Sequence, residues 1–267
     1  MRLVDMTPLS WDTNPTKTVG TGGTFYKAID TVDGVQHYYK MSSFDKFTVS
    51  FTGYESVFEV IVSRLCELFK IQSLRYNLIY AKICINGRTG YITDSAEFKQ
   101  RGESKIALEN FYQLEAPPDI DPYEFCKQMK WTDRLDEMFF IDYLICNRDR
   151  HGANLEVLQH GVDYRLAPLF DNGLSFTAPF GTALEAIAGY DVMSDIPCNN
   201  YLGSRYLTKN LELISNDFVI PTLPTDWKDA VSAEIKEAMP DTVWSKVFEM
   251  IDRRYAYVCD KLSNKRC

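Results

Sequence analysis

Three polar residues in the middle of the chain have the types and the spacing that phosphoryl transfer requires. Asp149 stands five residues before Asn154 in the run N-R-D-R-H-G-A-N, and Asp171 follows a short extended stretch. In phosphoryl transfer one carboxylate orients or deprotonates the attacking hydroxyl, while an amide oxygen and a second carboxylate hold the metal that bridges the phosphates. We therefore predict that Asp149 is the catalytic base and that Asn154 and Asp171 are metal ligands.

The same residues also fit a structural role, in which Asp149 is a cap or turn residue in a polar loop between a helix and a hairpin. The order of the segments favours chemistry, because the apolar run 139–146 leads into D-R-H-x-x-N and an extended stretch then leads into D-N-G. Asp142 interrupts the apolar run. Because a buried carboxylate needs hydrogen-bond donors, we expect backbone or Arg donors from the following loop to reach Asp142.

This stretch resembles the catalytic segment of the HipA-like serine/threonine kinases, which have G-N-x-D-x-H-x-x-N and then L-A-P-x-Y/F-D. The chain has N-R-D-R-H-G-A-N and then L-A-P-L-F-D, and its short length is similar to that of the compact CtkA-type members. The motif match covers about residues 135–176. Residues 20–98 resemble the family only in their general pattern, and no resemblance is present after residue 180. Cys146 replaces the usual Gly, and Asn-Gly follows Asp171 where eukaryotic protein kinases have Phe-Gly.

The N-terminal third has a second set of candidates in the order that kinases use: a glycine-rich turn, a strand lysine and a helix Glu. We predict that Lys40 holds the α- and β-phosphates. Glu55 and Glu59 lie one turn apart, and the register of the family favours Glu59 as the partner of Lys40. The resemblance also implies that Lys27 ends the phosphate loop. Glycines let backbone N–H groups approach phosphates, and the loop residues predicted to do so are Gly20, Thr21, Gly22 and Gly23.

Each of these N-terminal candidates has a structural alternative. The glycine-rich turn fits a hairpin, Lys40 fits a surface strand, and Glu residues on helices are usually solvated. In a two-lobed kinase residues 94–98 would form the hinge, where backbone groups bond adenine. We therefore predict Ser95 and Glu97 as further cofactor-binding residues.

The order of the expected elements, strands first and helices afterwards, predicts an α+β chain with a two-lobed protein-kinase-like fold. Ala116-Pro117-Pro118-Asp119 breaks the pattern, so we expect an N-lobe at 1–115 and a helical C-lobe at 116–267. Asp33-Gly34 predicts a hairpin turn, and apolar periodicity predicts a helix over 54–70. Further helices are expected over 199–214, 226–238 and 241–262.

Composition limits the partners and the compartment. The net charge is −8 and the pI is about 5.0, so direct nucleic-acid binding is not expected. The seven cysteines are widely spaced, without C-x-x-C, which is typical of reduced thiols. No apolar run approaches the length of a membrane span or a signal peptide. We expect a cytoplasmic protein, unless a non-Sec route exports it as an effector.

The leading hypothesis is a protein serine/threonine kinase that uses ATP and Mg²⁺, acting on a protein hydroxyl and controlled by an antitoxin or another regulatory partner. A small-molecule or lipid kinase on the same core is the first alternative. A phosphorylated lipid would call for basic groups in the acceptor loop, yet no Lys or Arg occurs between Arg165 and Arg205. This absence argues against phosphorylated lipids but not against an uncharged sugar or alcohol. The second alternative is a nucleotide-binding pseudokinase, but no essential group is missing.

The glycine-rich loop also suggests a means of control. HipA-like kinases carry in this loop a hydroxyl residue that is self-phosphorylated, which inactivates the enzyme. Thr18, Thr21 and Thr24 lie in or beside the loop. A phosphate there adds about −1.5 to −2 charges at pH 7 and would repel the phosphates of ATP. These threonines also fit simple strand and turn roles.

Overall fold

A computed structural model describes residues 1–12, 25–45, 48, 50–83 and 87–265. Six strands from the first hundred residues form one sheet, in which the first strand joins in parallel and all other neighbours are antiparallel. The order across the sheet is β1 (Leu3–Asp5), β7 (Asn77–Lys82), β8 (Thr89–Ala96), β4 (Val35–Met41), β3 (Lys27–Val32) and β2 (Trp11–Asp12).

The hairpin of β3 and β4 has the predicted turn. Asp33 and Gly34 have φ values of 51° and 80°, which are the left-handed values that a two-residue hairpin turn needs. The register pairs Lys27 with Lys40 directly across the two strands. Because residues that face each other across two strands project to the same side of a sheet, both lysines lie on one face.

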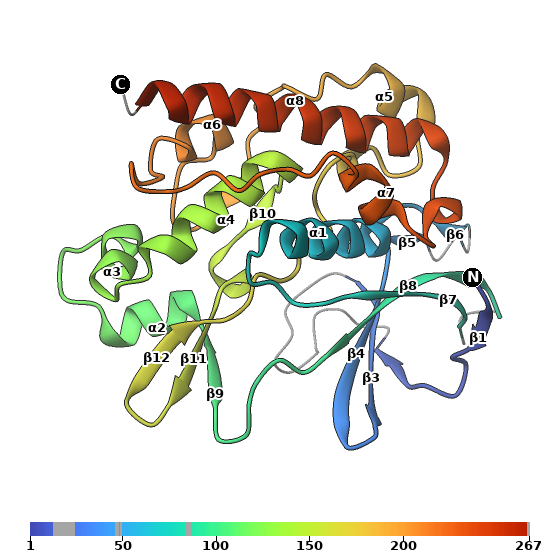
Figure 1. The fold of residues 1–267 in the computed structure, drawn as a ribbon. Helices are drawn as coiled ribbons and strands as arrows, with labels where there is room; N and C mark the ends of the chain where they lie inside the picture. Colours follow the sequence, from blue (N-terminus) through green and yellow to red (C-terminus); the bar gives the residue numbers. More distant parts are fainter. Residues whose placement is uncertain (13–24, 46–47, 49, 84–86, 266–267) are drawn as a thin grey trace.

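Helix α1 (Glu55–Phe69) packs against the sheet and lies between it and the helical part of the chain (Figure 1). Most of the helix is buried, including Glu55 and Glu59, which are 3% and 0% exposed. A buried helix carboxylate must find a partner, because an unpaired charge in the interior is costly. The burial of Glu59 therefore requires a cation or hydrogen-bond donors beside the helix.

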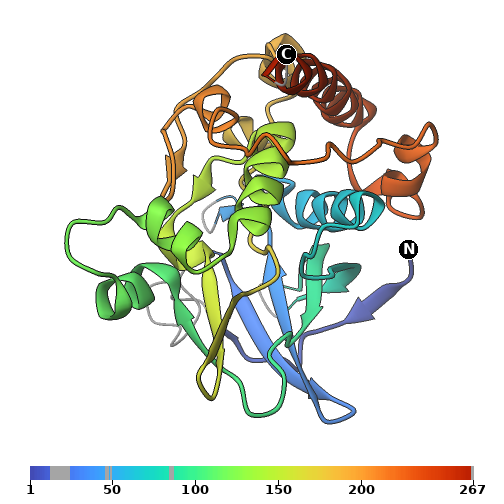
Figure 2. The same ribbon diagram turned by 60° about the vertical axis from the view of Figure 1, so that its left-hand side comes forward.

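The rest of the chain is mostly helical, and α4 (Thr132–Ile145) and α8 (Asp241–Lys265) are its long helices (Figures 1 and 2). The two helices contact each other, and the larger group of buried apolar side chains is shared by α1, α4 and α8. The shorter helices are α2 (Leu108–Glu115), α3 (Pro122–Gln128), α5 (Leu184–Gly189), α6 (Leu207–Asn210) and α7 (Trp227–Ser232). None of the described helices is long and apolar enough to cross a membrane.

A small sheet joins the two parts of the molecule. Its middle strand, β11 (Glu156–His160), pairs antiparallel with β9 (Ser104–Ala107) on one side and with β12 (Asp163–Leu166) on the other. Figure 1 shows these strands beside the hairpin of β3 and β4 but separate from it. The α+β fold with a sheet lobe and a helical lobe is as expected, while a boundary at residue 115 stays a prediction.

The C-terminal helices differ in part from expectation. The predicted helix over 199–214 is wrong, because the segment contains the strand β13 (Asn199–Asn200) and only the short helix α6. The side chain of Asn200 accepts hydrogen bonds from the backbone N–H groups of Leu202 and Gly203, at 3.0 and 2.9 Å. Such local bonds offer the backbone an alternative to a helix. The long helix predicted over 241–262 is confirmed as α8.

Candidate active site

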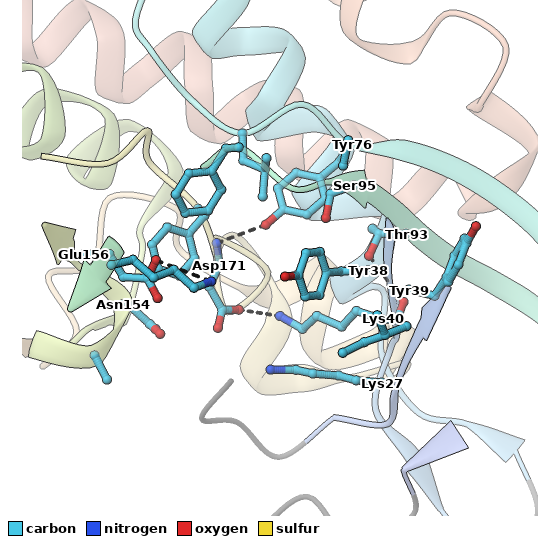
Figure 3. Close-up of a pocket in the computed structure, with 17 residues that line it drawn as sticks. Lys27, Tyr38, Tyr39, Lys40, Tyr76, Thr93, Ser95, Asn154, Glu156 and Asp171 are labelled. Carbon is cyan, nitrogen blue, oxygen red and sulfur yellow. Dashed lines mark hydrogen bonds and ion pairs between the residues drawn. The ribbon is translucent and has the colours of Figure 1, made fainter. Parts of the chain in front are cut away.

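Lys40 is the centre of an ion-paired cluster. Its Nζ lies 3.1 Å from Glu59 Oε1 on α1 and makes a close ion pair with Asp171 Oδ1. Figure 3 shows the side chain of Lys40 directed at Asp171. Three elements that are distant in sequence thus meet at one ammonium group. The predicted pairing of Lys40 with Glu59 is present.

The charges in this cluster depend on one another. Burial opposes ionisation of Lys40, yet the charges of Asp171 and Glu59 raise the pKa of this lysine above its ordinary value. Burial also raises the pKa of Glu59, and Lys40 only partly offsets that effect. For Asp171, burial favours the neutral form, but Lys40 holds the pKa below its usual value. Burial and the nearby Lys40 lower the pKa of Lys27.

Glu59 also connects α1 to the loop that carries Asp171. Its Oε2 accepts a hydrogen bond of 2.8 Å from the backbone N–H of Asn172. A Cβ on Gly173 would lie 3.1–3.2 Å from atoms of Glu55 and Glu59, so the residue after Asn172 must be small for the loop to approach the helix. This accounts physically for the Gly of the D-N-G run. Asp171 itself is left-handed at φ 53°, a conformation that Asp tolerates better than most residues.

A buried ion pair holds the loop that follows α4. Arg150 Nε and Nη2 donate to the two carboxylate oxygens of Asp142 at 3.0 and 2.7 Å, and the Asn147 side chain donates to Asp142 at 2.9 Å. Arg150 also donates to the carbonyl of Phe170 and to the side chain of Asn172. The expectation that Asp142 receives Arg donors is confirmed. The same guanidinium therefore joins the end of α4, the D-R-H loop and the Asp171 loop.

Asp149 lies in the two-residue strand β10 (Asp149–Arg150), which pairs in parallel with β13. The side-chain amide of Asn199 donates to Asp149 Oδ1 at 3.3 Å, and His151 Nε2 is 3.7 Å from Asp149 Oδ2. His151 Nδ1 accepts a hydrogen bond from the backbone N–H of Ala153, which braces the loop. Asn199 was not among the sequence-based candidates, and no motif marks it.

The residues predicted to hold Mg²⁺ are compatible with that ion. Asn154 donates its side-chain N–H to the backbone carbonyl of Asp149 at 2.8 Å. This hydrogen bond uses the amide nitrogen, so it does not occupy the amide oxygen that would bind a metal. Asn154 and Asp171 both line the same cleft. Among the described residues no group of three or more His, Cys, Asp or Glu could hold a metal. Mg²⁺ needs no such cage, since one or two oxygen ligands with water and substrate phosphates suffice.

The cleft lies between the large sheet and the loops that follow α4, and its empty space is about 830 Å³ up to the open mouth. Five predicted residues line it: Lys27, Lys40, Ser95, Asn154 and Asp171. Glu97 does not line the cleft, and its carboxylate accepts a hydrogen bond of 2.8 Å from the hydroxyl of Tyr38. The loop candidates lie outside the described residues: Gly20, Thr21, Gly22, Gly23, Thr18 and Thr24.

No family model and no curated protein matches the sequence. Among solved structures, the chain is similar to the proinflammatory kinase CtkA of Helicobacter pylori, with a TM-score of 0.64, 11% identity, and coverage of 99% of this chain and 98% of CtkA. It is also similar to HipA of Shewanella oneidensis MR-1, solved as a toxin–antitoxin complex with HipB and operator DNA. Here the TM-score is 0.51 and the identity 13%, and the match covers 96% of this chain and 68% of the other.

At these identities the similarity concerns the fold. The catalytic motif and the fold of the whole chain point to the same group of kinases. The chain has the protein-kinase-like fold of the HipA-like kinases, in the compact form of CtkA.

Proposed function

We propose that this protein is a serine/threonine protein kinase that depends on ATP and Mg²⁺. The observation that carries the proposal is the meeting of Lys40, Glu59 and Asp171, which come from a strand, a helix and a loop, in a cleft that Asn154 also lines. Phosphoryl transfer relies on positioning and on neutralisation of charge, and these groups are suited to both tasks.

Each residue has a role in the proposed reaction. Asp149 orients or deprotonates the attacking hydroxyl, and Asn199 holds the Asp149 carboxylate in place. Asn154 and Asp171 supply oxygen ligands for Mg²⁺, which neutralises the charge that develops on the phosphates. Lys40 binds the phosphates. Lys27 and the loop Gly20–Gly23 complete the phosphate site in this proposal.

The acceptor in this proposal is a protein hydroxyl, and the composition of the chain argues against a phosphorylated lipid. The segment between Arg165 and Arg205 contains no Lys or Arg and includes Glu185, Asp191 and Asp195. A phosphorylated lipid would need cationic groups near the acceptor, so this segment is poorly suited to such a substrate. HipA was solved together with HipB, and we extend the proposal to a regulatory protein partner of this chain.

Transfer of the γ-phosphate of labelled ATP to a generic protein substrate tests the proposal, with and without Mg²⁺. Asp149→Asn should reduce the rate by about 10²–10⁴-fold, which is the usual contribution of a single acid–base group. The control is Asp163→Asn, which alters an exposed carboxylate at the start of β12 and should leave the rate unchanged. Full activity of Asp149→Asn would refute the assignment of the base, and absence of any transfer by the wild type would refute the kinase proposal.

A further inference from the structure

Glu156 presents a carboxylate to the cleft for which the proposed reaction has no use. Its Oε2 is buried and receives no hydrogen bond from the described part of the chain. The nearest cation is Lys105 on β9, whose Nζ is 3.8 Å from this oxygen, which is beyond hydrogen-bond distance. A buried carboxylate without donors is costly, so a structural role alone does not account for it.

The charged neighbours of Glu156 differ from those of Asp171, although Lys105 also acts on Lys27 of the phosphate-binding cluster. Burial raises the pKa of Glu156, and the charges that act on it come from Lys105, which lowers the pKa, and from Glu97, which raises it. The charges that act on Asp171 come instead from Lys40, Lys27 and Arg150. The cleft therefore has two charged centres, one for phosphates and one farther along.

Aromatic residues surround this second centre. Lys105 Nζ lies 5.4 Å from the ring centroid of Phe98 and 5.8 Å from that of Tyr38. Phe98 stacks on Phe170 with centroids 6.1 Å apart. All of these side chains line the cleft, and Figure 3 shows Glu156 across the cleft from Tyr38. Flat apolar walls with one acceptor and one donor are the features that bind a nucleotide base.

The backbone at the end of β8 is partly engaged elsewhere. The N–H of Glu97 donates to the carbonyl of Gln36 at 2.8 Å, which extends the pairing of β8 with β4. That N–H is therefore not available to a base in the cleft. Recognition of the base must draw on other groups, and the side chains of Glu156 and Lys105 face the same space.

We propose that Glu156 and Lys105 read the nucleotide base: Glu156 accepts hydrogen bonds from the amino group of a purine, and Lys105 donates to the adjacent ring acceptor. A carboxylate accepts only, and an ammonium donates only. Adenine presents an amino group beside ring-nitrogen acceptors, and guanine presents N–H donors beside its O6. The inference rests on the proposed function, since a phosphate-binding cluster places the base at the other end of the cleft.

Calorimetry with nucleoside diphosphates in the presence of Mg²⁺ tests the inference without any phosphoryl transfer. ADP should bind the wild type about 10- to 100-fold more tightly than purine riboside diphosphate, which lacks the 6-amino group, because a hydrogen bond to a charged acceptor is at stake. The comparison of GDP with IDP, which lacks the 2-amino group, separates a guanine reader from an adenine reader. Equal affinities within both pairs would overturn the inference.

Variants distinguish a base-reading role from a simple link between β9 and β11. Glu156→Leu should abolish the preference for the amino-bearing nucleotide, and Glu156→Gln should reduce it while preserving the shape of the side chain. The matched control, Glu115→Leu at the exposed end of α2, should keep the full preference. A Glu156→Leu variant that loses affinity equally for ADP and for purine riboside diphosphate would overturn the inference while leaving the kinase proposal intact. A wild type that binds no nucleotide would overturn both.

Discussion

The buried pair of Asp142 and Arg150 allows a quantitative test of how the active-site loops are held. Both side chains are 1% exposed, and two hydrogen bonds join them. Asp142→Asn keeps the shape of the side chain but removes the carboxylate that forms the ion pair with the guanidinium. Removal of one partner from a buried ion pair costs about 3–5 kcal/mol. At roughly 2–4 °C per kcal/mol for a chain of this size, the melting temperature should fall by about 6–20 °C.

Urea unfolding followed by circular dichroism measures this loss. Asp133→Asn, an exposed carboxylate near the start of α4, is the control and should cost less than about 1 kcal/mol. The double variant Asp142→Asn with Arg150→Met should recover part of the stability, because it removes the unpaired charge. If the free energy of unfolding of Asp142→Asn lies within about 1 kcal/mol of the wild-type value, the pair does not hold the loops as described.

Five further outcomes are expected. Lys40→Ala should raise the ATP requirement in kinetic assays with the fold intact, and a variant that unfolds would make Lys40 a packing residue. Asp171→Asn should weaken nucleotide binding more with Mg²⁺ than without it, as measured by calorimetry. Lys40 lowers the pKa of Asp171 in the folded protein, so the charged carboxylate stabilises the fold at any pH above the unfolded pKa of about 3.8. This stabilisation disappears as the pH falls through the lower, folded pKa. Below the folded pKa, acid titration should therefore give Asp171→Asn and the wild type similar free energies of unfolding. Asn199→Ala should lower kcat with little change in the KM for ATP, whereas an equal change in both would refute a positioning role toward Asp149. Mass spectrometry after incubation with ATP should find phosphate on Thr21 or a neighbouring threonine, and unmodified threonines in an enzyme active on other substrates would rule out this means of control.

Local signals in the sequence predicted the elements that carry the central cluster. Asp33-Gly34 is a two-residue turn signal, and a turn of that kind fixes the register of its hairpin. Apolar periodicity predicted α1, the helix that carries Glu59 and that follows the strand of Lys40 in the chain. The contact between Lys40 and Glu59 could therefore be predicted, because the order of the elements in kinases places the two residues together.

Contacts between short irregular segments could not be predicted in the same way. Asn199 approaches Asp149 through a parallel bridge of two residues, and such a bridge has no periodicity. Glu156 and Lys105 face each other from β11 and β9, whose pairing follows from the path of the chain and not from any motif. In the segment after Asn199, bonds from side chains to the backbone replaced a helix that composition favoured.

One departure from the HipA-like motif lies at the end of α4. Cys146 takes the place of the usual Gly and ends α4 with φ 52°, a left-handed conformation that favours Gly. A non-Gly residue in this conformation costs roughly 1–2 kcal/mol. The thiol is fully buried and lies within hydrogen-bond distance of the hydroxyl of Tyr190, at 3.8 Å.

The charges of the described cleft explain why a metal ion should accompany the nucleotide. Three lysines line the cleft within the described residues, namely Lys27, Lys40 and Lys105. Two lining carboxylates, Glu156 and Asp171, together with Glu59 behind Lys40, balance them. A triphosphate adds several negative charges to a site that is already neutral. In the proposed reaction the chain would contribute geometry and oxygen ligands, and the additional positive charge that phosphoryl transfer requires would enter with the substrate.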